Sequence, residues 1–139
     1  GEAFHLNQSA EIEWAPDSSA FVVTQSEGGV VGTWQVTVYE LGPNGPMARE
    51  VTDSATKQFQ RMPAGCTEEQ PNIGAAGWIN SDTVLLVAEA PPHSSCRDMG
   101  TLRGYEVSVT NGKVVQELTT TALHANYRTR LGMRLRDRK

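Results

Sequence analysis

The segment 91–98 gathers the most reactive set of side chains in the chain. An imidazole, two hydroxyls, a thiol, a guanidinium and a carboxylate follow one another on His93, Ser94, Ser95, Cys96, Arg97 and Asp98. A cysteine nucleophile here would need a free sulfur with a depressed pKa and a neighbouring base, as in a hydrolase-like enzyme. Paired prolines and serines in a long connection are more typical of a loop, and loops on rigid sheets often hold binding residues. We therefore predict binding rather than catalysis at this segment.

Cys66 and Cys96 are the only cysteines. Between them, two apolar runs flank the turn signal Asn80-Ser81-Asp82, which predicts a β-hairpin. Each cysteine lies 15 residues from the centre of that turn, so an antiparallel continuation brings both to the open end of the hairpin. We predict a structural disulfide, with free buried thiols and redox or metal chemistry as the alternatives. A disulfide would leave no thiol nucleophile.

Other patterns offer little chemistry. His5, His93 and His124 lack zinc-ligand spacing, so we expect no metal and no cofactor. Glu11 and Glu13 alternate along a predicted strand and share a side, which is typical of a solvated face.

Charge is unevenly distributed along the chain. The net charge is −4, but the residues from Tyr127 onward carry +5, which leaves −9 for the rest. We interpret residues 131–139 as a solvated basic tail. The acidic body would repel a phosphate backbone and argues against nucleic-acid binding.

Length and composition predict one domain spanning residues 1–139, and no apolar run is long enough to cross a membrane. The chain opens Gly1-Glu2-Ala3-Phe4 without Met, as it would after removal of a signal peptide or a tag. Together with the predicted disulfide, this start favours a periplasmic or secreted location.

The chain contains an internal repeat. Residues 13–23 are echoed by residues 77–87 at an offset of 64, with Trp14 matching Trp78. Further along, Val36 matches Val107 at an offset of 71, so the second copy has a connection seven residues longer, placed at 90–103. The copies span about residues 10–62 and 74–130.

Each copy predicts four short antiparallel strands followed by a helix, which makes the fold mainly β with two blade-like sheets. The strands are expected at 10–14, 20–25, 33–41 and 48–52, and at 75–79, 83–90, 104–109 and 113–118. The helices are expected from a cap at 53–55 to about residue 61, and over 119–130. The cluster 42–46, rich in glycine and proline, and the Asn111-Gly112 pair predict turns.

The run Trp14-Ala15-Pro16-Asp17-Ser18, followed by Phe21-Val22-Val23, resembles the W-S-P-D-G and apolar-strand pattern of TolB-type β-propeller repeats. Trp78-Ile79-Asn80-Ser81-Asp82 resembles a second copy that lacks the proline, and Ser18 stands where the pattern prefers glycine. The resemblance implies blade-like sheets with each tryptophan packed at the inner end of its blade.

Two copies are fewer than the four to eight blades that close a propeller. Three arrangements remain open: two sheets packed together, an oligomer that completes a larger assembly, or a fragment. We favour a self-contained pair of sheets and leave a homodimer open.

These observations predict an extracytoplasmic binding or interaction module for an unknown protein or small molecule. The expected surface is the 90–103 connection together with Val30, Val31 and Trp34, because equivalent connections of the two copies should lie at one end. The predicted binding residues are Trp34, His93, Ser94, Ser95, Arg97, Asp98 and Arg103. The alternatives are a hydrolase-like enzyme using the His93 to Asp98 loop and a structural envelope component.

Overall fold

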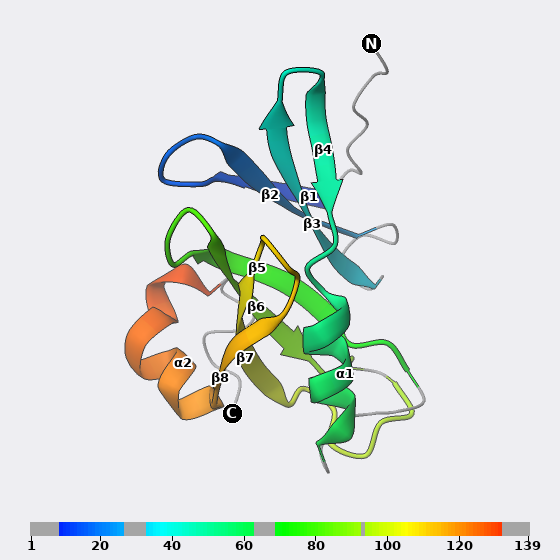
Figure 1. The fold of residues 1–139 in the computed structure, drawn as a ribbon. Coiled ribbons are helices and arrows are strands. Elements are labelled where there is room, and N and C mark those ends of the chain that lie inside the picture. Colours follow the sequence, from blue (N-terminus) through cyan, green and yellow to red (C-terminus); the bar gives the residue numbers. More distant parts are fainter. Residues whose placement is uncertain (1–8, 27–32, 63–68, 93, 132–139) are drawn as a thin grey trace.

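The computed structural model describes residues 9–26, 33–62, 69–92 and 94–131. It contains two four-stranded antiparallel sheets and two short helices, which confirms the mainly β fold (Figure 1). Sheet 1 has the order β1-β2-β3-β4, and sheet 2 has the order β5-β6-β7-β8. The bounds are β1 (Ser9–Trp14), β2 (Ala20–Ser26), β3 (Trp34–Gly42), β4 (Gly45–Arg49), α1 (Asp53–Arg61), β5 (Asn72–Trp78), β6 (Thr83–Glu89), β7 (Leu102–Ser108), β8 (Val114–Leu118), α2 (Thr120–Tyr127) and the 3-10 turn η1 (Arg128–Arg130).

The turn between β1 and β2 explains one departure from the repeat pattern. Ser18 has a φ of 62°, in the region that glycine adopts most easily, so this is where the pattern prefers glycine. The turn is held by Asp17, whose Oδ1 accepts hydrogen bonds from the backbone N and the Oγ of Ser19 at 2.9 and 2.6 Å.

The β3–β4 hairpin is tighter than the sequence predicts. Gly42 pairs with Gly45, which leaves only Pro43 and Asn44 in the turn. The fourth strand is present as predicted but covers Gly45–Arg49, so its predicted bounds of 48–52 lie three residues too far along the chain. Pro46 is tolerated within β4 because an edge strand does not need every N–H for pairing.

The register of the two sheets corrects the predicted repeat. Trp14 pairs with Phe21, whereas Trp78 pairs with Val84, so the second strands correspond at an offset of 63. Phe21 in turn pairs with Tyr39, and Val84 with Val107, which makes the third-strand offset 68 instead of 71. Because an odd shift moves a side chain to the other side of a sheet, the predicted match of Val36 with Val107 is wrong.

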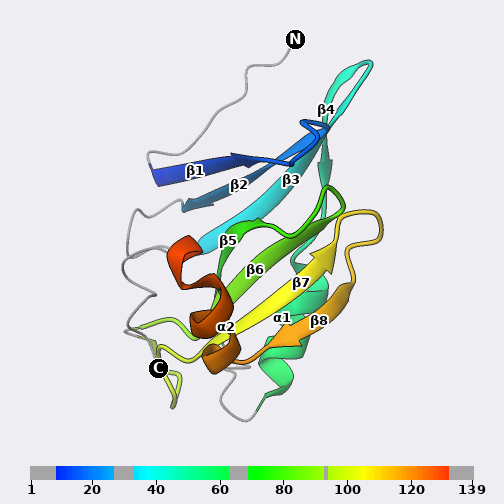
Figure 2. The same ribbon diagram turned by 90° about the vertical axis from the view of Figure 1, so that its left-hand side faces the viewer.

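The two faces of sheet 1 follow directly from its register. We call outer face the side that carries the even-numbered residues of β1 and β4 and the odd-numbered residues of β2 and β3. The remaining residues of these strands form the inner face. Sheet 2 lies against the inner face (Figure 2).

The sheets meet where β5 crosses the inner face of sheet 1 from β3 to β1. Three hydrogen bonds mark the crossing. The backbone N of Trp34 donates to Asn72 Oδ1 at 3.2 Å, and the backbone N of Ala75 donates to Thr24 Oγ1 at 2.9 Å. At the far end, Trp78 Nε1 donates to the carbonyl oxygen of Glu13 at 3.1 Å. One apolar core runs through the crossing, including Val22, Val38, Trp78 and Leu86.

The helices cover opposite faces of sheet 2 (Figure 1). Phe59 of α1 packs into the core shared with sheet 1, while Leu123 of α2 packs with Leu85 and Leu102 on the other face. Both helices lie where they are predicted. The start of α1 differs, because Thr52 is the N-cap and the Glu50 carboxylate accepts the Asp53 backbone N–H at 2.8 Å.

The two repeat tryptophans are not in equivalent surroundings. Trp78 is 5% exposed in the core between the sheets, whereas Trp14 is 52% exposed. The implied packing of both tryptophans at the inner end of a blade is therefore wrong for Trp14.

Candidate functional site

The predicted binding loop lies at the end of the molecule where Trp34 begins β3. Trp34 donates its backbone N–H to Asn72, and Asn72 pairs across the sheet with Glu89, the residue that precedes the loop. Figure 2 shows the β6–β7 connection on the same side as the start of β3. The structure thus brings Trp34 and the loop to one end. Val30 and Val31, also expected there, lie outside the described residues.

The loop is closed at its base by backbone hydrogen bonds. Ala90 donates its N–H to the carbonyl of Thr101 at 3.0 Å, and its own carbonyl accepts from Gly100 at 2.8 Å. The carbonyl of Asp98 accepts from the hydroxyl of Thr101 at 2.8 Å. These bonds extend the β6–β7 hairpin and fix the residues at the base of the connection.

The two serines of the loop form hydrogen bonds within the chain. The backbone N and Oγ of Ser95 both donate to Glu69 Oε1, at 2.8 and 2.6 Å. These hydrogen bonds from Ser95 lower the pKa of the Glu69 carboxyl. Ser94 Oγ donates to the carbonyl of Pro91 and accepts from the backbone N of Cys96 at 3.3 Å. Both hydroxyls thus help to fix the loop.

Cys96 is buried, and the part of the chain that the structure describes contains no free cysteine. A cysteine nucleophile needs a free and accessible thiol, so this geometry gives no support to a Cys96 nucleophile. Cys66 and His93 lie outside the described residues. The disulfide between Cys66 and Cys96 and the role of His93 stay predictions.

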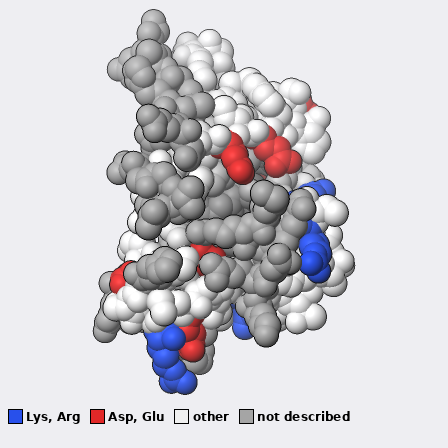
Figure 3. All heavy atoms as spheres, turned by 180° about the vertical axis from the view of Figure 1, so that it is seen from behind, with Lys and Arg blue, Asp and Glu red and all other residues white. Residues whose placement is uncertain are grey.

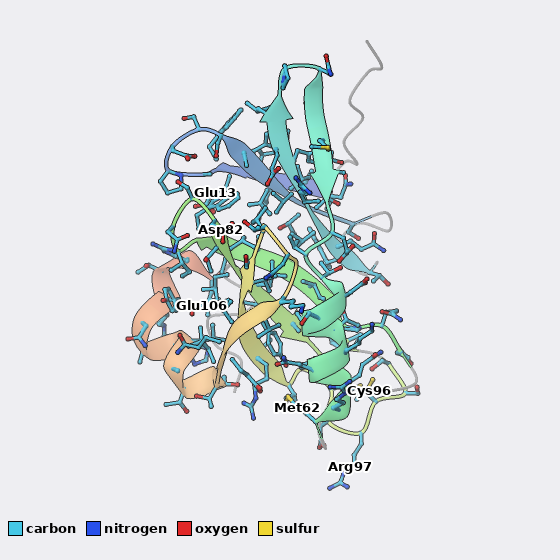
Figure 4. All side chains as sticks on the ribbon, viewed as in Figure 1. Glu13, Met62, Asp82, Cys96, Arg97 and Glu106 are labelled. Atoms are coloured by element: carbon cyan, nitrogen blue, oxygen red, sulfur yellow. The ribbon has the colours of Figure 1, made fainter. Side chains whose placement is uncertain are left out.

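The tip of the loop presents Arg97 and Met99 to solvent. The Arg97 side chain is 94% exposed and extends away from the body, while Cys96 lies toward α1 (Figure 4). Arg97 Nε is 3.9 Å from a carboxylate oxygen of Asp98, a distance at the limit of an ion pair. Met99, which the sequence analysis did not select, is also exposed. No sequence pattern marked Met99, because it lies in a turn, where side chains follow no regular period.

Arg103 does not share the loop tip. It lies in β7 and forms an ion pair with Glu117 of β8, with Nε 3.5 Å from Oε1. Two residues along the same strand, Tyr105 pairs with Glu117, and its pKa is raised by burial first and then by the Glu117 charge. Arg103 thus lies one residue inside β7, which begins at Leu102, and not in the loop itself; its role in binding stays a prediction.

A second feature is a hollow of about 240 Å³ between β1, β2 and β5. Glu11 and Glu13 line it together with Thr24, which confirms that the two carboxylates share a side. Nearby, Arg130 Nη1 donates to the carbonyl of Trp78 at 3.0 Å, so this arginine is part of the fold. Among the described residues, no three His, Cys, Asp or Glu side chains are placed to hold a metal ion.

From behind, acidic and basic side chains are scattered over the described surface and do not form one patch of a single sign (Figure 3). No helix in the described part of the chain is long and apolar enough to span a membrane.

Comparison with known proteins finds no match among family models, curated proteins or solved structures.

Proposed function

We propose that this protein is an extracytoplasmic binding module that contacts a protein partner through the loop 90–101. The observation that carries the proposal is a loop fixed by its own hydrogen bonds that exposes Arg97 and Met99 at its tip. A loop that is already ordered loses little conformational entropy on binding.

The chemistry of the tip indicates the kind of partner. Arginine and methionine are both enriched at protein interfaces, where the guanidinium pairs with carboxylates and the thioether adapts to apolar surfaces. Because Arg97 Nε lies 3.9 Å from Asp98 Oδ1, the ion pair between them is weak, and the guanidinium is able to bind another carboxylate. The partner we propose presents an acidic group next to an apolar one.

The extracytoplasmic location rests on the proposed disulfide between Cys66 and Cys96. The buried position of Cys96 and the lack of a free cysteine among the described residues support it. Titration of thiols in denaturant should find none before reduction and two afterwards. Two reactive thiols in the unreduced chain would contradict the disulfide and this argument for location.

The binding proposal is tested by affinity capture from an extracytoplasmic extract, with bound proteins quantified by mass spectrometry. The loop variant Arg97→Glu/Met99→Ser should lose a partner that the wild-type chain retains. The matched control is Lys113→Glu/Val115→Ser, which makes the same changes in charge and polarity at the opposite end of the β7–β8 pair. Equal capture by all three chains would contradict the loop as the binding surface.

A further inference from the structure

Strand β1 forms one edge of sheet 1, and in the part of the chain that the structure describes no strand pairs with its free side. The backbone N–H of Ala15 donates to the carbonyl of Ala20 at 2.9 Å, so Ala15 belongs to a hydrogen-bonded pair of the β1–β2 ladder. Such pairs alternate along an antiparallel ladder, so the backbone groups of Ile12 and Trp14 point to the free side. A free row of this kind is a template for one more strand.

The side chains of β1 alternate between two kinds. Ile12 and Trp14, on the outer face, are about half exposed. Glu11 and Glu13 are exposed on the inner face, where they line the hollow. An added strand places its own alternate side chains beside these two sets, so the strand that fits β1 alternates apolar residues with basic ones. The β1 strand of a second copy does not fit, because it would bring the glutamates of the two chains together.

The chain contains a segment with the required alternation. Residues 133–136 read Met-Arg-Leu-Arg, in which two apolar side chains alternate with two guanidinium groups. They belong to the basic tail predicted for 131–139, of which residues 132–139 lie outside the described structure. Their pattern is complementary to that of β1 in both charge and polarity.

The described chain ends close to β1. A Cβ placed on Gly77 would lie 3.1 Å from Glu13 Oε1 and 3.4 Å from Arg130 Nη1, so the tips of both side chains lie beside this residue of β5. Leu131 follows in an extended conformation and packs on sheet 2. In Figures 1 and 2 this end of the chain lies on the side of α2 that is nearer to sheet 1. The next residue is Gly132, and glycine permits a sharp change of direction.

We propose that residues 133–136 add to the free edge of β1 as an antiparallel fifth strand of sheet 1. The register that satisfies every side chain pairs Met133 with Trp14, Arg134 with Glu13, Leu135 with Ile12, and Arg136 with Glu11. An arginine beside a carboxylate and a methionine beside an aromatic ring are both favourable contacts. The antiparallel direction starts the new strand at the Glu13 end of β1, which is the end beside Arg130. The tail so placed closes an edge that could otherwise pair with another chain.

Hydrogen exchange of backbone amides, measured by NMR on the full chain, tests the pairing residue by residue. In this register the N–H groups of Ile12 and Leu135 take part in the new ladder, whereas that of Arg136 points away from β1. The amides of Ile12 and Leu135 should therefore exchange about tenfold or more slowly than that of Arg136, after correction for intrinsic rates. Exchange as fast at Ile12 and Leu135 as at Arg136 would overturn the proposal.

Charge reversal in the tail identifies the side chains that hold the strand. Arg134→Glu/Arg136→Glu should remove the protection of the Ile12 amide, because carboxylates then lie opposite carboxylates. Arg138→Glu/Lys139→Glu is the matched control: it makes the same change in charge in the same tail, beyond the paired residues, and should retain the protection. Equal protection of Ile12 in these two variants would contradict the proposed pairing.

The reciprocal change distinguishes a direct contact from a general effect of charge. Glu11→Arg/Glu13→Arg, added to the Arg134→Glu/Arg136→Glu variant, brings opposite charges together again and should restore the protection of Ile12. Circular dichroism checks that each variant keeps its β-sheets. Protection in the wild-type chain should not change over about a tenfold range of concentration, because pairing within one chain does not depend on it. Protection that rises with concentration would show pairing between two copies and overturn the proposal.

Discussion

The contact between Gly104 of β7 and Leu123 of α2 allows a quantitative test of how α2 is attached to sheet 2. A Cβ added at Gly104 would lie 2.6 Å from Leu123 Cδ2 and 3.1 Å from the Cβ of Leu118. Leu123 is fully buried and is the only buried residue of α2, so it has little room to move. Gly104→Ala should therefore lower the free energy of unfolding by about 2 kcal/mol through overpacking.

The second substitution removes volume from the same contact instead of adding it. Leu123→Ala removes the anchor of α2 and leaves a cavity, which should cost about 3 kcal/mol. In the double variant, the new methyl group at position 104 occupies part of that cavity. The double variant should thus lose about 3 kcal/mol, which is about 2 kcal/mol less than the sum of the two single losses.

Urea unfolding of the four chains, followed by circular dichroism, measures these values from midpoints and slopes. Losses that simply add in the double variant would show that Gly104 and Leu123 do not contact each other as described. A single variant at Gly104 with wild-type stability would refute the close packing of α2 on β7.

Two further predictions concern turns that join the elements. Gly112→Ala should destabilise the chain by about 1–3 kcal/mol, because Gly112 has a φ of 70° and its added Cβ would lie 2.7 Å from the carbonyl oxygen of Glu50. Gly45→Ala is the control, since Gly45 also has a positive φ but has no atom near its added Cβ; equal losses of stability in urea would refute the contact. Hydrogen bonds from Thr110 hold the pKa of Asp82 below its usual range, so Asp82 stabilises the fold above about pH 4 and this contribution disappears as the pH falls further. Asp82→Asn should therefore flatten the decline of stability between about pH 4 and 2, and an unchanged decline would count against the role of this carboxyl.

Much of the fold was predictable because local signals agreed with it. Alternating apolar residues, turn residues such as Asn111-Gly112 and the Thr119 cap identify eight strands and two helices close to their observed bounds. The errors arise where the sequence gives no local marker of register. The turn after Trp78 is one residue shorter than the turn after Trp14, because Trp78 pairs with Val84 and Trp14 pairs with Phe21. This difference changes the repeat offset by one, so residues matched by the predicted offset lie on opposite faces of their sheets.

The candidate site was predictable only in part. Its position beside Trp34 follows from the topology of two equivalent hairpins, and the structure confirms it. The structural roles of Ser94 and Ser95 depend on partners that are distant in sequence, such as Glu69. Arg103 was assigned to the loop because a loop boundary cannot be read to within one or two residues.

The most direct test of the proposed function is photocrosslinking in the compartment where the protein resides. A benzophenone side chain at Met99 should give a discrete crosslinked product that Arg97→Glu removes, whereas the same group at Val115 should give none. Val115 suits this comparison because it is exposed on β8, at the end of the β7–β8 pair far from the loop. Crosslinking at Met99 no stronger than at Val115 would contradict the account of this loop as a binding surface.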